Sequence, residues 1–337
     1  MIDKIIRESI DSLLLEEFGI IYGLEPLGQY ILERFFDFML NQCFNETPYT
    51  ELEFEQEISM QEIKSDISCK NWYGIDKLDS IILKTVVNSY DEASLNYDDL
   101  ENLKPIIVIN IDRGFTKQEL YEKVSKYGNQ KVFNMFCHKY EPSIMHELTH
   151  LIEIVNTRGK YKSPAYAYMD DPDYEDQVAM KQVRRASFAF SKTEMNARVT
   201  TIYYQILNSK DLISGIKAWN GKRYELCKKL VWLTSSYNWV NEMKKYLFII
   251  RRAAEKGEKP DVEFVKNFIK INKLAAFSGS KNLFNLRWNK NDTGEVEDIS
   301  KVVWKLYDRL YELYYSYIKK LYNAANLAIE EVINKRS

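Results

Sequence analysis

The spacing of apolar residues along the chain predicts mostly helices, with one short region of strands. Apolar positions recur at helical intervals over residues 3–18 and 28–44. Over residues 52–60, apolar and acidic residues alternate instead, which is typical of a strand with one solvent-exposed face. Two β-branched runs, 80–88 and 105–111, predict further strands. A small sheet is therefore expected in the first third of the chain.

The region after these strands predicts two helices. A short helix is expected over 116–127, closed by Gly128, whereas 131–140 is compatible with an edge strand or a helix. Pro142 suits the first turn of the next helix, because its missing N–H costs nothing there. Apolar residues follow at helical spacing, and Gly159 supplies a stop. This second helix contains two of the three histidines of the chain.

The second half of the chain reads as helical after one loop. Tyr, Pro and Asp are frequent over 160–176, which predicts a loop, and a helix is expected over 192–208. Long helices are expected over 222–256, 261–275 and 298–335. The sequence thus predicts an α+β protein that is predominantly helical, with a small sheet followed by a helical C-terminal lobe.

Length and composition predict a folded, helix-rich protein of one large domain or two. The chain is 45% hydrophobic and 14% aromatic, which excludes a disordered chain, and its 12 Gly and 7 Pro are too few for an all-β protein. The expected parts are 1–48, 49–210 and 211–337. We find no signal peptide and no run near the ~18 apolar residues of a membrane span, so a soluble, cytoplasmic protein is expected, without a membrane partner.

The net charge of -2 conceals two oppositely charged regions. Residues 1–60 hold about 13 acidic and about 3 basic residues, whereas 209–290 hold about 18 basic and about 7 acidic. Four aromatic residues lie within the basic region: Trp232, Tyr237, Trp239 and Trp288. The basic region could bind nucleic acid or an acidic partner. Two alternatives stay open: solvated lysines opposite a core-facing aromatic stripe, or attraction between the two regions of the chain itself.

One pentapeptide carries a metal-binding pattern. Residues 146–150 read His146-Glu147-Leu148-Thr149-His150, the H-E-x-x-H pattern. On a helix, residues four apart share a face, so both imidazoles can reach one ion, and Glu147 can reach a water bound to it. Two nitrogens and a carboxylate suit a zinc ion and leave one position open. The alternative is a pair of surface histidines that binds nothing.

The pentapeptide resembles the zincin metallopeptidases, and its letters HELTH occur in thermolysin-like members. The resemblance implies a sheet packed on the motif helix, one zinc ion and, in the gluzincin branch, a third ligand from a later helix. The metzincin branch does not fit, because this chain has Glu153 and Asn156 where that branch needs Gly and His. The similar segment covers roughly residues 80–208.

Glu194 is the expected third ligand under this resemblance. It begins the helix predicted over 192–208, 44 residues after His150, and Ala197 would allow a close approach to the motif helix. Arg198 could orient its carboxylate as an i,i+4 partner. Glu153 is the rival, on the motif helix itself, where a supporting or solvated role is more natural. Thermolysin-like proteins place this ligand much nearer the motif, so the subfamily stays unassigned.

The expected function is zinc-dependent hydrolysis of a protein or peptide substrate, with Glu147 as general base. Four residues are candidate donors to the developing oxyanion: Tyr166, Tyr168, Tyr204 and Arg198. His138 is expected to be an ordinary hydrogen-bonded histidine. The four cysteines lie far apart, which predicts free thiols in a reducing compartment.

Parts of the sequence also bear on two other functional classes, a di-iron protein and a structural or interaction protein. Glu147-x-x-His150 is also half of a di-iron signature, but His138 has Met135 three residues before it, so the second half is absent. A structural or interaction protein could instead retain a zincin core without peptidase activity. Usage rich in Lys, Asn, Ile and Tyr resembles that of an AT-rich genome such as a phage, which favours a virion-associated variant of this alternative.

Overall fold

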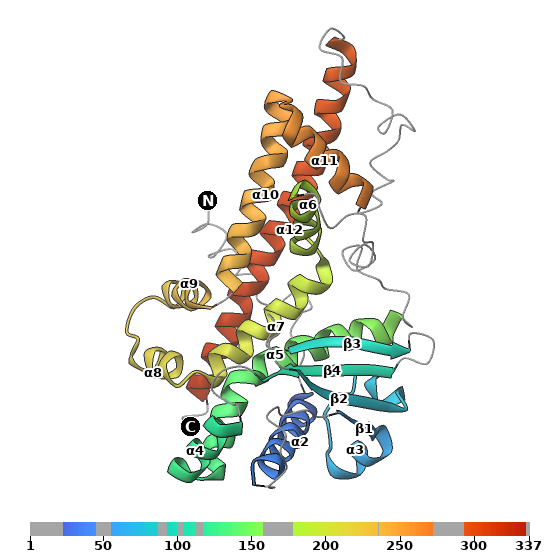
Figure 1. The fold of residues 1–337 in the computed structure, drawn as a ribbon. Coiled ribbons are helices and arrows are strands. Elements are labelled where there is room, and N and C mark those ends of the chain that lie inside the picture. The colour runs from blue at the N-terminus through green and yellow to red at the C-terminus, as the bar shows by residue number, and fades with distance from the viewer. Residues whose placement is uncertain are drawn as a thin grey trace. The chain divides into compact units, whose positions relative to one another are not determined.

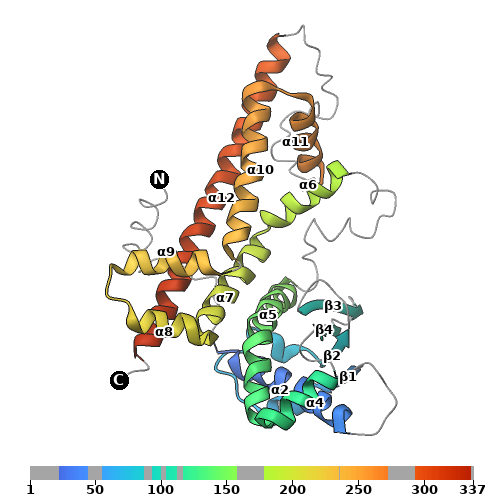
Figure 2. The same cartoon turned by 60° about the vertical axis from the view of Figure 1, so that its left-hand side comes forward.

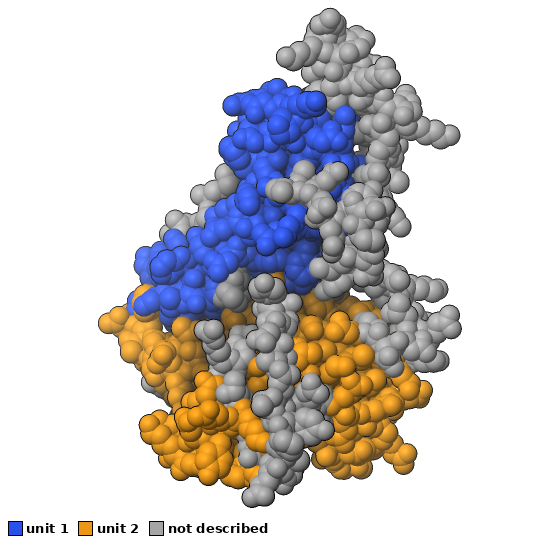
Figure 3. All heavy atoms as spheres, in the orientation of Figure 1, with its two compact units in different colours: residues 1–17, 162–195, 221–326 blue, residues 18–161, 196–220, 327–337 orange. Residues whose placement is uncertain are grey.

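The computed structural model is mainly helical and contains one four-stranded sheet, which confirms the α+β class (Figure 1). It describes residues 23–44, 55–86, 93–99, 104–111, 117–157, 178–234, 236–271 and 293–334. The chain divides into two compact units (Figure 3). Unit 1 comprises 1–17, 162–195 and 221–326, and unit 2 comprises 18–161, 196–220 and 327–337. The division into 1–48, 49–210 and 211–337 stays a prediction.

Unit 2 contains a mixed sheet with the strand order β1-β2-β4-β3. Its strands are β1 Glu55–Ser59, β2 Ser80–Val86, β3 Ala93–Asp99 and β4 Lys104–Asn110. The central strands β2 and β4 run parallel, whereas β1 and β3 pair antiparallel with β2 and β4 respectively. Most side chains of β2 and β4 are buried on both faces, which explains why these two strands read as continuous β-branched runs.

The edges of the sheet differ from the prediction. The strand expected over 52–60 ends at Ser59, because the Ser59 hydroxyl accepts a hydrogen bond from the Glu62 amide and caps helix α3, Met60–Asp66. Strand β3 was not predicted, since its sequence ASLNYDD lacks clear alternation. It forms through pairing with β4, in register Ala93 opposite Ile109.

Unit 2 also contains several helices, some of which pack against this sheet. They are α2 Glu25–Phe44, α3, α4 Lys117–Tyr127, α5 Asn129–Thr157, α7 Lys192–Asn208 from its fifth residue onward, and α8 Lys210–Ala218, with a 3-10 turn η1 Ile75–Lys77. Helices α2, α4 and α5 contact one another, and α5 also packs against β3 and β4 (Figure 2). The helices expected over 28–44, 116–127 and 192–208 are confirmed, whereas α8 was not predicted.

The position of α5 is fixed by close contacts with α2 and β4. At Gly28, a Cβ atom would lie 2.9 Å from the Sδ atom of Met145, so the two helices approach closely there. The buried Tyr140 hydroxyl donates to the carbonyl oxygen of Asn110 at the end of β4, at 3.1 Å. These contacts hold the segment of α5 that leads into the H-E-x-x-H motif.

Helix α5 begins earlier than expected, and the prediction that Pro142 opens it is wrong. The helix starts at Asn129 and contains Pro142 in its interior. Val132, Phe136 and Tyr140 recur every four residues and are each 0% exposed, so this segment buries one helical face. That burial offsets the hydrogen bond lost at the proline, which ordinarily costs about 3 kcal/mol inside a helix.

Unit 1 is a helical assembly. Its helices are α6 Val178–Ala189, α9 Arg223–Leu233, α10 Ser236–Lys256, α11 Lys259–Ile271 and α12 Thr293–Asn334 up to its residue 326. Helices α10 and α12 lie side by side in both ribbon views (Figure 1 and Figure 2). The helices expected over 261–275 and 298–335 are confirmed with shifted ends, and α6 was not predicted. The expected helix 3–18 and loop 160–176 lie outside the described residues.

The single helix expected over 222–256 is wrong, because α9 and α10 are separate. At Thr234 the backbone is extended and the side-chain hydroxyl donates back to the Val231 carbonyl at 2.8 Å. Helix α10 then packs on α6 and α11, with the Tyr246 and Phe264 rings stacked at 6.0 Å. In the part of the chain that the structure describes, no helix has both the length and the apolar character needed to cross a bilayer.

Candidate metal centre

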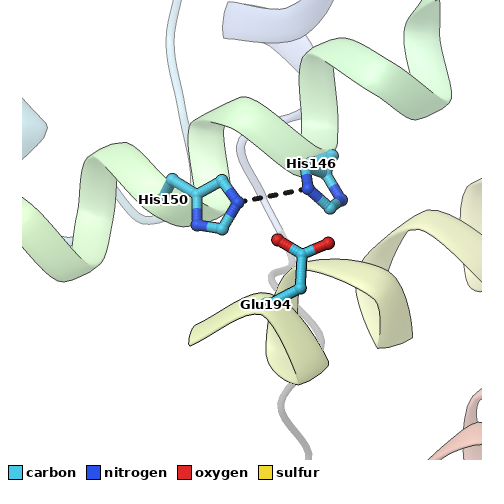
Figure 4. A group of neighbouring side chains, drawn as sticks. All are labelled: His146, His150 and Glu194. Carbon is cyan, nitrogen blue, oxygen red and sulfur yellow. Dashed lines mark hydrogen bonds between the residues drawn. The ribbon is translucent and has the colours of Figure 1, made fainter. Parts of the chain in front are cut away.

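Two histidines lie on one face of α5. The Nε2 atoms of His146 and His150 are 3.1 Å apart, and their rings are nearly perpendicular, with centroids 4.7 Å apart (Figure 4). This proximity follows from the helix, in which residues four apart lie one above the other. His150 is buried and His146 is half-buried. Helix α5 therefore presents two imidazole nitrogens to the same point.

The carboxylate of Glu194 faces the two imidazoles from a second helix (Figure 4). Glu194 stands in the first turn of α7, and the rest of that helix, from Asn196 onward, belongs to unit 2 together with α5. Its side chain is only 1% exposed. One ligand atom from each of the three residues lies within 4.8 Å of the other two. The structure thus brings together the three residues that the sequence indicated as ligands.

The donor set and its spacing fit a zinc ion. Zinc binds histidine nitrogen and carboxylate oxygen at about 2.0–2.2 Å with tetrahedral geometry, so neighbouring ligand atoms lie about 3.3–3.5 Å apart. The Nε2 atoms of His146 and His150 are 3.1 Å apart, and the whole set spans at most 4.8 Å. Small side-chain adjustments therefore suffice to bring all three atoms to bonding distance. Three protein ligands leave a fourth position for water or substrate.

Thr201 fixes which nitrogen of His146 carries the proton. Its Oγ1 lies 3.0 Å from His146 Nδ1, and its single hydroxyl proton is donated to the Ala197 carbonyl at 2.9 Å. Thr201 can therefore only accept from Nδ1–H, which leaves the lone pair on His146 Nε2, the atom that faces His150 and Glu194. The contact of Thr201 with His146 was not predicted from the sequence. Its signal was the spacing of seven residues from Glu194, which places both on one face of α7.

Two further glutamates of α5 lie near the three donors. Glu147, the expected general base, is 9% exposed and is not one of the three converging ligands. Glu153, the rival third ligand, accepts a hydrogen bond from the side-chain amide of Asn196 at 3.2 Å. That bond ties α5 to the beginning of α7, so Glu153 supports the approach of the two helices that carry the donors.

The candidate oxyanion donors have different surroundings. The buried Tyr204 hydroxyl donates to the Glu25 carboxylate at 2.8 Å, and burial, followed by the charge of Glu25, raises the pKa of Tyr204. Its proton is therefore directed to Glu25. Arg198 is half-buried, one turn after Glu194 on α7. Tyr166 and Tyr168 lie outside the described residues.

His138 and the described cysteines lie outside the set of three converging donors. His138 lies two turns before His146 on α5, and burial, aided by the charge of Lys210, lowers its pKa, which favours the neutral imidazole. The cysteines described, Cys69, Cys137 and Cys227, are free. Burial, followed by the charge of Glu141, raises the pKa of Cys137 to about 12, so its thiol is poorly reactive.

Comparison of the chain with protein families, with curated proteins and with solved structures finds no match. What this chain does must therefore be inferred from the site itself: which donor atoms converge, how deeply they are buried and which groups orient them.

Proposed function

We propose that this chain is a zinc-dependent metallopeptidase of the gluzincin type. His146, His150 and Glu194 would hold one zinc ion, and Glu147 would serve as the general base. The observation that carries the proposal is the convergence of these three donors from two helices that are distant in the sequence. The two histidines would share a face of α5 even if they bound nothing. A buried carboxylate from α7 that faces them completes a set of donors typical of a metal site.

The arrangement of unit 2 supports a zincin-like core. Helix α5, which carries the motif, packs against β3 and β4. In the described sheet, β3 stands at one end of the strand order and pairs antiparallel with β4. A small sheet packed on the motif helix, followed by a helix that supplies a carboxylate, is the arrangement that the resemblance to zincins implies.

The proposed reaction is hydrolysis of a peptide bond. A bound zinc ion would supply a Lewis acid that polarises the peptide carbonyl and lowers the pKa of a water molecule. Glu147 accepts the proton of the attacking water as its oxygen bonds to the carbonyl carbon. Glu147 then gives this proton to the nitrogen that leaves as the C–N bond breaks. His146 and His150 would hold the ion through ring nitrogens that carry no proton, while Thr201 accepts a hydrogen bond from the other ring nitrogen of His146.

The first test measures the metal. Protein purified without chelators and supplied with zinc is expected to hold one zinc ion per chain by elemental analysis. Glu194→Gln removes an anionic ligand and is expected to weaken zinc binding at least tenfold, measured by competition with a chromogenic chelator. Glu153→Gln makes the same chemical change on α5 outside the donor set and is the matched control, expected to keep zinc within about twofold of the wild type.

The second test separates binding from catalysis. Glu147→Gln is expected to retain zinc but to lose the cleavage of casein or of a proteome-derived peptide mixture by at least about 10²-fold, since the base is absent. Mass spectrometry of the products measures this directly. A wild-type protein that binds no zinc would refute the metal site. Zinc binding without any cleavage that depends on Glu147 would favour the structural role instead.

A further inference from the structure

Unit 1 contains a small apolar cavity, far in the sequence from the metal-binding motif. The cavity measures about 100 Å³ and is formed by α9, α10 and α12. It is lined by Lys228, Val231, Trp232, Tyr237, Val240, Lys244, Ile318, Leu321 and Tyr322. A water molecule occupies about 30 Å³ of liquid, so the cavity has the size of about three waters, or of one aliphatic or aromatic side chain.

Large exposed apolar side chains lie on α9 and α10, two of the helices that form this cavity. Among the described residues of unit 1, the large apolar side chains that are exposed belong to Trp232, Leu233 and Phe248. Trp232 is 61% exposed and forms one wall of the cavity. Phe248 is 62% exposed and follows Lys244 by four residues on α10, so it continues the same face of that helix. Trp232 beside the cavity, with Phe248 further along α10, provides exposed apolar surface of the kind that marks interaction sites in soluble proteins.

The charge at this surface is positive. The cavity lining contains Lys228 and Lys244 but no acidic residue, and the surrounding sequence 209–290 carries the basic excess. At the far end of the face, Arg252 lies over the Phe248 ring at 5.6 Å and is paired with Asp261 on α11, so it adds little net positive charge there. An apolar cavity bordered by cations fits a ligand that combines an apolar anchor with negative charges beside it.

The length of the face indicates the shape of the ligand. Tyr237 and Phe248 are separated by eleven residues of α10, or about 16 Å at 1.5 Å per residue. A second helix laid along α10 would span this distance in about three turns and would place side chains at i, i+4, i+7 and i+11 against it. Its apolar stripe would meet Trp232, the cavity and Phe248 in turn.

We propose that this face of α9 and α10 docks an acidic amphipathic helix of a partner protein. One apolar side chain of that helix fills the cavity, and flanking carboxylates pair with Lys228 and Lys244. A nucleobase is a poor occupant, because its polar edge would lose water against Val231 and Ile318 without gaining hydrogen-bond partners. The proposal is independent of the metal site, and each can fail without the other.

The test uses the full chain and a defined probe. The probe is a fluorescein-labelled 16-residue helical peptide with Leu on one stripe and Glu at the other positions, and its control is the same peptide with Lys in place of Glu. Fluorescence anisotropy at about 0.1 M salt is expected to give binding of the acidic peptide in the micromolar range, and at least tenfold weaker binding of the basic one.

Variants of the face provide the matched comparison. Trp232→Ala and the double change Lys228→Glu with Lys244→Glu are each expected to weaken binding of the acidic peptide at least fivefold. Trp232 is well exposed, so its removal leaves the fold intact. Lys256→Glu reverses a charge on the same helix outside the cavity lining and is expected to change binding less than twofold.

Three outcomes would overturn the proposal. The first is no binding of the acidic peptide up to about 1 mM, or binding that all these variants leave unchanged. The second is a dimer of the wild-type chain in analytical ultracentrifugation that Trp232→Ala disperses, which would assign the face to a second copy. The third is tighter binding of a 12-nucleotide single strand than of the peptide, abolished by Trp232→Ala, which would assign the face to nucleic acid.

Discussion

At the scale of single residues, the proposed site depends on which ring nitrogen of His146 carries the proton. A histidine binds metal through an unprotonated nitrogen, and the hydrogen bond at its other nitrogen decides which one that is. For His146 that partner is Thr201, whose own proton is engaged by the Ala197 carbonyl. Helix α7 therefore contributes both a proposed ligand, Glu194, and the hydroxyl that would orient a proposed ligand on α5.

The first prediction concerns the Thr201 hydroxyl. Thr201→Val preserves the shape of the side chain but removes the acceptor, so His146 loses its preference for the Nδ1–H tautomer. Long-range ¹H–¹⁵N spectra of the metal-free protein are expected to show Nδ1–H at His146 in the wild type and a mixture in the variant. Zinc affinity is expected to fall 10–100-fold. With three histidines in the chain, single substitutions assign the signals.

Two control variants make this prediction specific. Thr201→Ser retains a hydroxyl and is expected to restore both the tautomer and the affinity. Thr149→Val removes a hydroxyl bond of the same kind, to the Met145 carbonyl at 2.8 Å, without touching a histidine nitrogen. It is expected to leave the tautomer of His146 unchanged. A Thr201→Val protein with wild-type tautomer and wild-type zinc affinity would show that Thr201 does not position the ligand.

At the scale of elements, two glycines show how backbone conformation positions the helices. Gly74 precedes the turn η1 with φ at +90°, and an added Cβ would lie 3.4 Å from Val155 and 3.3 Å from the Asn156 side chain on α5. Gly215 lies within α8, where an added Cβ would meet nothing within 4 Å. The same substitution therefore has opposite consequences at the two positions.

The second prediction is that replacement by alanine lowers the free energy of unfolding at Gly74 and raises it at Gly215. Gly74→Ala is expected to lower the free energy of unfolding by about 1–2 kcal/mol, because a positive φ is strained for any residue with a Cβ. Gly215→Ala is expected to raise it by about 0.5–1 kcal/mol, because alanine is the better helix former at an open site. Urea denaturation followed by circular dichroism measures both. Equal effects at the two positions would contradict the assigned backbone conformations.

At the scale of the whole molecule, stability is coupled to pH through a half-buried carboxylate of α5, Glu141. Burial raises the pKa of Glu141, the Asn208 amide that donates to it at 2.7 Å opposes this, and the charge of Glu25 adds to the rise. A carboxyl group with a raised pKa holds its proton more tightly in the folded chain than in the unfolded chain. Stability is therefore lost as pH rises from the ordinary carboxyl range through the folded pKa.

The third prediction is that Glu141→Gln removes this loss. Glutamine keeps an oxygen that accepts from Asn208 but cannot ionise, so the variant is expected to gain stability relative to the wild type as pH rises. Urea denaturation of both proteins at about pH 4.5 and about pH 7 measures the difference at each pH. A difference that stays constant, or that shrinks towards neutral pH, would show that Glu141 carries no buried charge in the folded state.

The sequence predicted those features of the fold that depend on local periodicity. The central strands β2 and β4, and the helices α2, α4 and α7, follow from the spacing of apolar residues in their own segments. Strand β3 could not be predicted in this way, because its polar sequence forms a strand only by pairing with β4. The early start of α5 was left open between strand and helix, although Val132, Phe136 and Tyr140 are spaced as one buried helical face.

For the candidate site, the sequence by itself determined that His146 and His150 share one helical face, since the spacing of four within one helix fixes this whatever surrounds it. Only the tertiary structure decided that Glu194 faces them and that Glu153 is bonded to Asn196. It also decided that Thr201 contacts His146. These contacts join two helices. How one helix packs against another is set by burial between distant parts of the chain, not by the spacing of residues within either helix.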